Sequence, residues 1–401
     1  MFNSLKFKVI LFGFIFTFFS SFGQSYFLGI FNSSIRETLS ITHGQFGSIY
    51  ASATLCSSLL LIWVGKKIDD VNVFKFALFV IILLSFACFF FSKVSSVLLL
   101  FIGIFLMRFS GQGMMSHTAS TTISRYFTKT RGRALSINWI GLSSAEFTLP
   151  VLMVYLLTFI DWQNLWLVFS IIVLIVLPIV SFLLIKNLNL DSREANDENI
   201  KQVEIKQWKR REVIKDYRFY IISLNMLAMP WIFSGFAVFQ SFVQTSKGWG
   251  PYIIAQSFMS YSVFSVLTLF LSGFLIDKFS SRKLLIYMNI PLLLAAIILF
   301  FFDTPIIAFI FLGLVGSSNG FANILGSSTW AELYGVKYLG SIKALSTALM
   351  VFATAFGVAL FGYLIDIGFT VGDIAVVSGI YIFISLILLF LVRKKLNPVI
   401  I

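Results

Sequence analysis

Two charged side chains, Arg108 and Glu146, each lie near the middle of a long apolar stretch of this sequence. A charge at the centre of a bilayer costs roughly 2.5–3.5 kcal/mol on insertion scales, so such groups usually face a partner or a water-filled cavity. The guanidinium can bind an anion, and the carboxyl can accept and release a proton. The two residues could therefore form a substrate and proton site, or a buried ion pair that only joins two helices.

Uncharged polar residues could complete a substrate site. Gln112 follows Arg108 by four residues, which is about 40° around a helix, so the two side chains share a face. Asn319 and Asn323 have the same spacing. Taken one at a time, such residues more often form interhelical hydrogen bonds than ligand contacts. The candidate substrate-binding residues are Arg108, Gln112, Glu146, Gln24, Tyr26, Asn225, Asn319 and Asn323, and Glu146 is also the candidate for proton coupling.

The motifs of several enzyme and pump classes are absent from the sequence. It has no His/Cys/Asp cluster for a metal, no glycine-rich phosphate loop followed by Lys-Ser/Thr, and no nucleophile elbow. The two cysteines, Cys56 and Cys88, lie inside apolar stretches, which favours buried small residues over a disulfide. We therefore expect a protein that is not an enzyme and that uses no metal, no cofactor and no ATP.

The composition predicts that lipid surrounds much of the chain. Apolar residues make up 58% and charged residues 12%, and the mean hydropathy is +0.94. Soluble domains carry roughly 25% charged residues. So few charges could not cover so much apolar surface in water.

Twelve apolar segments are each long enough to cross a hydrocarbon core of about 30 Å. Helices are required because backbone polar groups in lipid must be paired within the segment, and the short alternating strands of a barrel are not seen. The first segment is too long for a signal peptide and lacks a clear cleavage site, so we interpret it as a helix. The predicted spans are 8–31, 43–64, 73–92, 95–120, 133–158, 163–186, 217–243, 252–276, 283–302, 305–329, 340–366 and 372–392.

A repeat with an offset of 208 residues divides the chain into two similar halves. Gly65 and Asp69 recur as Gly273 and Asp277, and Tyr126 recurs as Tyr334. The predicted fold is therefore an all-α integral membrane protein with twelve transmembrane helices in two pseudo-symmetric six-helix halves. We expect an N-terminal half at 1–186, a polar cytoplasmic linker at 187–216, with a short surface helix near 203–214, and a C-terminal half at 217–401. Two similar membrane halves are the usual plan of a secondary transporter.

The basic residues predict the orientation. With the N-terminus inside, 26 of the 30 Lys and Arg residues fall in the cytoplasmic segments, as the positive-inside rule requires. The net charge of +13 is thus a topology signal, and we expect no nucleic-acid partner. We expect a monomer in the bacterial cytoplasmic (inner) membrane, with both termini cytoplasmic, whose partners are a small-molecule substrate and membrane lipid.

The loops that hold these basic residues resemble those of the major facilitator superfamily. Its diagnostic loop reads Gly-x-x-x-Asp-Arg/Lys-x-Gly-Arg-Arg/Lys, and the second copy here, from Gly273 to Lys283, matches it better than the first. The first copy has Asp70 in place of a base and Asn72 in place of glycine. The resemblance implies the fold of that superfamily and a latch that holds the cytoplasmic side closed; the alternative is that these are solvated loop charges. The candidate gating residues are Gly65, Asp69, Arg125, Arg131, Asp277, Lys278, Arg282 and Glu332.

Further motifs are similar to the oxalate/formate antiporter and monocarboxylate porter branch. They are Arg125-Tyr126-Phe127, Arg131-Gly132-Arg133-Ala134, Asp161-Trp162-Gln163 and the stretch Trp330 to Gly335. Carboxylate porters of this branch usually have a basic residue in the eighth or eleventh helix. Here the eighth segment has no charge before Asp277, and the eleventh has only Lys343 near its end.

We expect a secondary active transporter that moves a small, monocarboxylate-like organic anion by alternating access, by symport with a proton or by antiport. One alternative is efflux of a less polar small molecule, which the aromatic-rich helices and the charge-poor second half favour. A membrane receptor that does not transport its ligand, and a membrane enzyme, are the alternatives from other classes.

Overall fold

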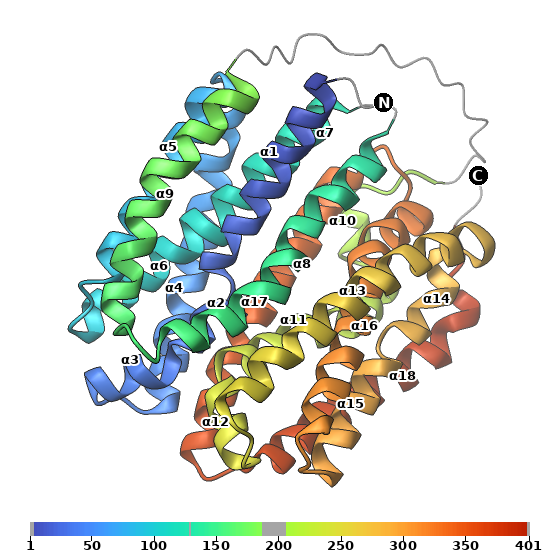
Figure 1. Ribbon diagram of the computed structural model, residues 1–401. Helices are drawn as coiled ribbons and strands as arrows, with labels where there is room; N and C mark the ends of the chain where they lie inside the picture. Colours follow the sequence, from blue (N-terminus) through green and yellow to red (C-terminus); the bar gives the residue numbers. More distant parts are fainter. Residues whose placement is uncertain (1–3, 128–129, 187–205, 399–401) are drawn as a thin grey trace. The chain divides into compact units, whose positions relative to one another are not determined.

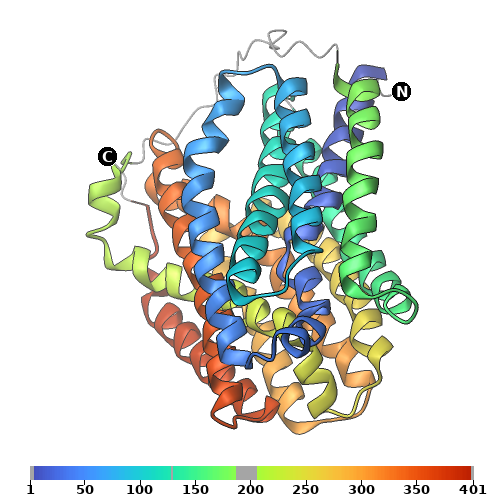
Figure 2. The ribbon, with the colours of Figure 1, turned by 90° about the vertical axis from the view of Figure 1, so that its left-hand side faces the viewer.

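The computed structural model describes residues 4–127, 130–186 and 206–398, without the side chains of Asp69, Arg131, Asp277 and Ser327. Every regular element among these residues is a helix (Figures 1 and 2). Twelve helical stretches are long and apolar enough to cross a membrane, which confirms the predicted fold class. The chain forms two compact units, residues 1–198 and 199–401, and each is described by itself.

The first unit contains nine α-helices, two 3-10 turns and one π-helical segment among its described residues. The α-helices are α1 Ser4–Ser20, α2 Ser25–Ile30, α3 Asn32–Leu39, α4 His43–Val64, α5 Val73–Phe91, α6 Val97–Met107, α7 Ser116–Tyr126, α8 Arg131–Leu156 and α9 Trp162–Ile185. The 3-10 turns are Ser21–Gly23 and Gly65–Asp69, and the π-helix is Arg108–Met115.

The second unit, in its described part, contains nine α-helices and a 3-10 turn, Arg393–Lys395. The α-helices are α10 Arg210–Val213, α11 Tyr217–Val238, α12 Gln240–Ser246, α13 Pro251–Phe279, α14 Ser281–Met288, α15 Ile290–Phe301, α16 Ile306–Tyr334, α17 Leu339–Asp366 and α18 Val371–Val392. The surface helix expected near 203–214 is only the four-residue α10, and residues 203–205 lie outside the described part of the chain.

The first predicted span, 8–31, is not one continuous helix. α1 ends at Ser20, the chain makes the 3-10 turn Ser21–Gly23, and Gln24 is extended (φ −81°, ψ 151°) before α2 begins. The fourth predicted span is also interrupted, because the π-helix separates α6 from α7. These two interruptions lie in the same half.

Two spans are longer than predicted. α7 continues to Tyr126 instead of ending at 120, and α16 continues to Tyr334 instead of ending at 329. The extra turn of α16 carries large aromatic side chains, Trp330 and Tyr334, which are buried in the core of the second unit. The predicted seventh span, 217–243, instead ends at Val238 with α12 following, and Pro230 lies inside α11 without ending it.

Aromatic packing holds the broken first span in place. Phe22 and Phe27, on either side of the break, both meet the edge of the Trp166 ring on α9, with ring centroids 5.9 and 5.6 Å away. Trp166 is fully buried. Edge-to-face pairs of this kind contribute roughly 0.5–1.5 kcal/mol beyond the area that they bury.

In the second unit, α13 and α16 pack with their backbones in contact. A Cβ at Gly316 would overlap the carbonyl oxygen of Tyr261, and one at Gly320 would overlap the Thr268 hydroxyl. Small residues at such positions let two membrane helices approach closely.

Candidate functional site

Arg108 is the first residue of the π-helical segment and is 3% exposed. Its Nη1 donates to the carbonyl oxygen of Gly23 over 2.9 Å, and its guanidinium carbon lies 5.3 Å from the centre of the Tyr50 ring. Its Nε is buried and has no hydrogen-bond partner among the described residues. Part of the donor capacity of this cation is therefore still available to a ligand.

Two glycines bring the interrupted helices together around Arg108. A Cβ at Gly111 would lie 2.6 Å from the backbone nitrogen of Gly23, and a Cβ at Gly23 would overlap the carbonyl oxygen of Met107. The turn that ends α1 therefore rests directly on the π-helical backbone. This approach places the Gly23 carbonyl within hydrogen-bond reach of Arg108.

A glutamine follows each of these glycines. Gln24 lies at the break before α2, and Gln112 lies in the π-helix; both are half-buried. Neither side chain forms a hydrogen bond with a described residue. A Cβ at Gly23 would lie 2.4 Å from the backbone nitrogen of Gln112, so the two glutamines belong to segments whose backbones are in contact.

Two tyrosines connect this region to other helices. The Tyr50 hydroxyl on α4 bonds the Ser25 hydroxyl at 2.9 Å. Tyr26 on α2 is 1% exposed and lies within electrostatic range of the Glu146 carboxylate on α8. Tyr26, which directly follows the break in the first span, is thus near the second buried charge.

Glu146 is 6% exposed and makes no hydrogen bond or ion pair with the described residues. The buried Arg108–Glu146 ion pair that the sequence left open is therefore not formed in this structure. Arg108 contacts Gly23 and Tyr50 instead. Helical depth could be estimated from the sequence, but the direction in which each side chain points could not.

The polar candidates of the second unit do not gather at one place. The Asn225 side chain donates to the Ser385 hydroxyl at 3.5 Å, and the backbone carbonyl oxygen of Asn225 accepts a 2.6 Å hydrogen bond from the Asn289 side chain. Asn319 donates to the Ser265 hydroxyl at 2.9 Å. Asn323 is exposed. Asn225 and Asn319 thus form interhelical hydrogen bonds, the more ordinary of the two roles that the sequence allowed.

The first copy of the loop motif is held by α7. Arg125 Nη1 donates to the carbonyl oxygen of Ile68 over 3.1 Å, and His117 Nε2 lies 3.0 Å from the carbonyl oxygen of Gly65. A Cβ at Gly65 would lie 3.3 Å from that imidazole nitrogen, so a side chain here would crowd the contact. The predicted side chains of Asp69 and Arg131 lie outside the described part of the structure.

Glu332 on α16 binds residues of the second copy of the loop motif. Its Oε1 pairs with Arg282 Nε at 2.9 Å, and its Oε2 accepts the backbone N–H of Ser281 at 2.9 Å. This places a carboxylate at the N-terminus of α14, where the helix dipole favours negative charge. Lys278 is exposed and lies over the Phe279 ring, and the side chain of Asp277 is outside the described residues.

The amino-acid pattern of most of the chain fits one family. The model of the major facilitator superfamily matches residues 13–341. The chain belongs to the major facilitator superfamily. None of the curated proteins matches it by sequence.

Two solved structures show the same fold. The chain superimposes on a bacterial homologue of the human lysosomal transporter Spinster, in an inward-facing and occupied conformation, with a TM-score of 0.75 and 15% identity, covering 98% of this chain and 97% of that one. It superimposes on the nucleoside transporter NupG with a TM-score of 0.71 and 14% identity, covering 98% and 99%. At this identity the likeness establishes the fold and not the substrate.

Membership of the major facilitator superfamily makes this chain an integral membrane transporter rather than an enzyme. Transporters of this fold bind small molecules within the membrane.

One polar cluster was missed by the sequence analysis. Arg218 Nη2 pairs with the Asp216 carboxylate at 2.7 Å, and the Tyr334 hydroxyl donates to that carboxylate at 3.2 Å. Arg218 and Arg282 also donate to Asn397, at 2.8 and 2.7 Å, and so hold the chain after α18. Asp216 and Arg218 stood among the many charges around the linker, and no motif distinguished them.

The residues just before α11 are also attached to the second unit. The backbone N–H of Trp208 donates to the Tyr334 carbonyl oxygen at 3.0 Å. Lys206 pairs with Glu212 at 2.9 Å and holds the pKa of that carboxyl below its usual range. The described end of the predicted linker is therefore docked rather than free.

Proposed function

We propose that this chain is a secondary active transporter of a small, monocarboxylate-like organic anion, working by alternating access and coupled to protons or to exchange. The observation that carries the proposal is Arg108, a cation at membrane depth whose buried Nε has no partner in the part of the chain that the structure describes. An unsatisfied charge in this environment is costly unless a ligand or a wet cavity compensates it.

Arg108 is suited to bind a carboxylate. A guanidinium presents its donors in a rigid fork that matches two carboxylate oxygens, and bonds of this kind are stronger than neutral ones. The Gly23 carbonyl occupies Nη1 and fixes the orientation of the fork. The half-buried amides of Gln24 and Gln112 can then orient a small polar substituent next to the carboxylate.

Glu146 is the proposed proton carrier. It lies in the same half, is buried, and makes no ion pair with the described residues. A carboxylate substrate that arrives at Arg108 adds negative charge near this group and favours its protonation. Anion and proton would then load together, and their charges would cancel for the passage across the membrane.

The two loop copies are the proposed gating elements. In this family, alternating access is largely a rocking of one repeat against the other around a fixed site. Arg125 on the Ile68 carbonyl, and Arg282 on Glu332, stiffen the ends of the helices at which we place the cytoplasmic side. The excess of basic residues at those ends supports cytoplasmic termini in a bacterial inner membrane.

The test is uptake by the purified protein in proteoliposomes. Radiolabelled formate, acetate, lactate and oxalate are offered with and without an inward proton gradient, and with each unlabelled anion inside for counterflow. Saturable uptake of one anion that the proton gradient or counterflow accelerates supports the proposal. A protein that binds an anion but shows no counterflow is a receptor, and the absence of saturable uptake for all four anions contradicts the proposal.

A further inference from the structure

Four exposed cations of the second unit, here called the basic cluster, lie where α14 begins and where α18 ends. Lys283 belongs to α14, and Arg393, Lys394 and Lys395 form the 3-10 turn that follows α18. None of the four forms an ion pair within the part of this unit that the structure describes. Clusters of Lys and Arg directly beside a membrane span attract anionic headgroups.

The described acids next to the basic cluster are neutralised by two other arginines. Glu332 pairs with Arg282 at 2.9 Å, and Asp216 pairs with Arg218 at 2.7 Å. These side chains are 22% and 25% exposed in the first pair. They are 10% and 5% exposed in the second pair. The charge of the four outer cations is therefore left to a partner from outside the chain.

The turn that carries three of the four cations is fixed to the helices. Arg218 Nη1 donates to the backbone carbonyl oxygen of Lys395 at 3.3 Å, and Arg282 Nη1 donates to that of Leu396 at 3.1 Å. The Leu396 side chain is 2% exposed and belongs to the core of the unit. Because Arg282 directly precedes Lys283, these bonds also bring the turn close to Lys283. Cations that are already ordered lose little conformational freedom when they bind a ligand.

Exposed apolar side chains adjoin the basic cluster. The guanidinium carbon of Arg393 lies 3.5 Å from the centre of the Phe390 ring. Phe390 and Leu391, in the last turn of α18, are 49% and 70% exposed. On α14, Tyr287 follows Lys283 by one turn and is 57% exposed. Such a change from apolar and aromatic to basic side chains is typical of the level at which acyl chains meet headgroups.

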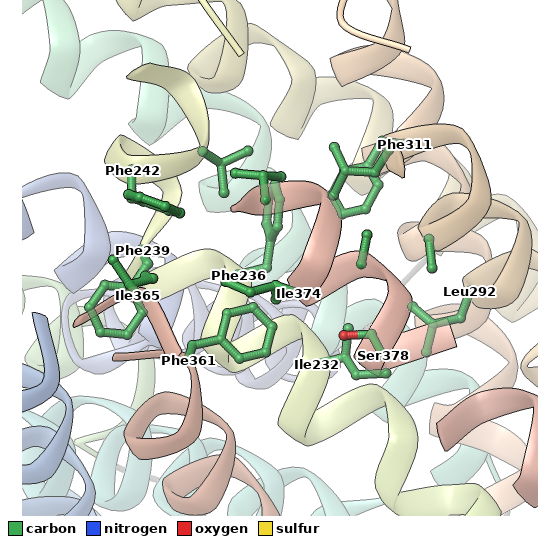
Figure 3. A pocket seen from close by; sticks show the side chains of 15 residues that line it. Ile232, Phe236, Phe239, Phe242, Leu292, Phe311, Phe361, Ile365, Ile374 and Ser378 are labelled. Carbon is green, nitrogen blue, oxygen red and sulfur yellow. The ribbon is translucent and has the colours of Figure 1, made fainter. Parts of the chain in front are cut away.

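The opposite end of α18 has a different character. Its first turns line a small pocket with Ile374 and Ser378, together with residues of α11 and α15 (Figure 3). The pocket has a volume of about 30 Å³, which is little more than a water molecule needs, and no charged residue lines it. Asp373 caps this end of the helix by accepting the backbone N–H of Thr370 at 2.8 Å. A preference for anionic lipid along α18 should therefore be confined to its basic end.

From these observations we propose that the basic cluster binds the phosphate headgroup of an anionic bilayer phospholipid, whose acyl chains lie along Phe390 and Leu391. The fork of Arg393 can bind two phosphate oxygens, and the ammonium groups bind phosphate as point charges. The exposed apolar side chains favour a lipid over a soluble phosphate. The inference does not rest on the proposed anion transport, because Arg108 and Glu146 belong to the first unit.

A fluorescent reporter on α18 tests which lipid is enriched. Leu391→Cys is introduced into the full-length protein that lacks Cys56 and Cys88, labelled with bimane, and reconstituted in phosphatidylcholine vesicles. Phosphatidylglycerol or phosphatidylcholine that carries a nitroxide near the headgroup end of its acyl chain is added at equal mole fraction. The nitroxide quenches bimane on contact, so the ratio of quenching by the two lipids measures local enrichment.

We expect phosphatidylglycerol to be enriched about fivefold or more at position 391, because a single cation near an anionic surface already strengthens attraction roughly fivefold. The control reporter is Val376→Cys, on the same helix and 40% exposed. It lies 15 residues away, or about 22 Å along the helix. There the two lipids should quench equally.

Removal of charge tests the residues. A variant with Gln at the four positions of the basic cluster should bring the ratio at position 391 close to one. A matched control removes the same number of charges from exposed positions in and beside α10, and it should keep most of the enrichment. Its substitutions are Lys209→Gln, Arg210→Gln, Arg211→Gln and Lys215→Gln. Thermal unfolding in detergent shows whether both variants fold.

Salt provides a test on the unaltered cluster. Raising the ionic strength from about 0.1 M to about 1 M shortens the screening length from about 10 Å to about 3 Å, so the enrichment should fall. An enrichment that salt leaves unchanged contradicts binding by the cations.

Three further results overturn the proposal. The first is equal quenching by the two lipids at position 391 of the otherwise unaltered protein. The second is an equal loss of enrichment in the cluster variant and in the matched control, because overall surface charge would then explain it. The third is displacement of the lipid by excess glycerol phosphate, which would assign the basic cluster to a soluble phosphate instead.

Discussion

The Nη1 atom of Arg108 donates a hydrogen bond to the carbonyl oxygen of Gly23 over 2.9 Å, between a π-helical segment and the turn that ends α1. π-Helical segments frequently coincide with functional sites, and half-broken helices are where transporters commonly bind their cargo. The bond fixes one side of the guanidinium, while its Nε has no partner within residues 4–127, 130–186 and 206–398.

Arg108→Gln should abolish binding of organic anions, since the site loses its cation. Arg108→Lys should keep only part of the affinity, because an ammonium cannot offer the planar fork. We expect a loss of at least about tenfold for the lysine variant, measured by ligand-induced thermal stabilisation. Arg133→Gln, at an exposed position of α8, is the control and should bind normally. Unchanged anion binding by Arg108→Gln would show that the arginine is structural.

Glu146→Gln should preserve anion binding and exchange but remove the stimulation of uptake by an inward proton gradient. The amide mimics the protonated carboxyl and can no longer release a proton. Uptake is measured in proteoliposomes with an inner pH of about 7.5 and an outer pH of about 5.5, a gradient of about two units. Glu37→Gln, an exposed carboxylate on α3, should leave the stimulation intact. Accumulation by Glu146→Gln under the gradient would exclude Glu146 as the coupling group.

Glu332→Gln should weaken the second unit and slow transport. The pair with Arg282 is only 22% and 25% exposed at its two side chains, so we expect a loss of about 1–2 kcal/mol in unfolding free energy. A cysteine introduced at Ser328 on α16 should also react faster with a water-soluble maleimide. Glu212→Gln, outside the membrane spans, serves as the matched control. Normal transport together with unchanged reactivity at position 328 would refute a gating role.

The orientation can be checked with two single cysteines in a background that lacks Cys56 and Cys88. Ser246→Cys, at the end of α12, should react with an impermeant maleimide in intact cells. Ser192→Cys, in the linker, should react only after the cytoplasmic side is exposed, because basic residues favour that side. Labelling at position 192 in sealed cells would reverse the proposed topology.

Gly316→Ala should destabilise the second unit by roughly 1–3 kcal/mol, since the added methyl group overlaps the carbonyl oxygen of Tyr261. Gly326→Ala lies on the same helix with nothing within 4 Å of its Cβ, and should be neutral or stabilising by about 1 kcal/mol. Thermal unfolding in detergent compares the two. Equal melting temperatures would contradict the close packing of α13 on α16.

The helices and the two halves could be predicted because the length and polarity of each segment report the solvent around it. The interruptions of the first and fourth spans could not be predicted. No proline lies in 8–31, and the sequence Arg108-Phe-Ser-Gly-Gln-Gly is compatible with an ordinary helix. The interruption depends on the approach of Gly23 to Gly111, two glycines 88 positions apart, and a local pattern does not contain it.

The direction in which each polar side chain points could also not be predicted from the sequence. Each of Arg108 and Glu146 lies near the middle of its predicted span, which suggested that they could pair. In the structure, the Arg108 guanidinium instead contacts the carbonyl of Gly23 and the ring of Tyr50. The same is true of Asn225, whose partner Ser385 lies on a helix 160 residues away. Which of several polar residues will be satisfied by a neighbour is decided by packing.

The contact of α13 with α16 also has a mechanical consequence. Where two backbones touch at Gly316 and Gly320, there is no layer of side chains that could change rotamer to let one helix slide along the other. Shear motions depend on such small sliding of packed helices, whereas hinges use a few residues at the ends of elements. We therefore expect α13 and α16 to move as a single lever arm, and the bending within this half to fall at their ends, next to Ser280, whose φ of 70° already lies outside the helical range.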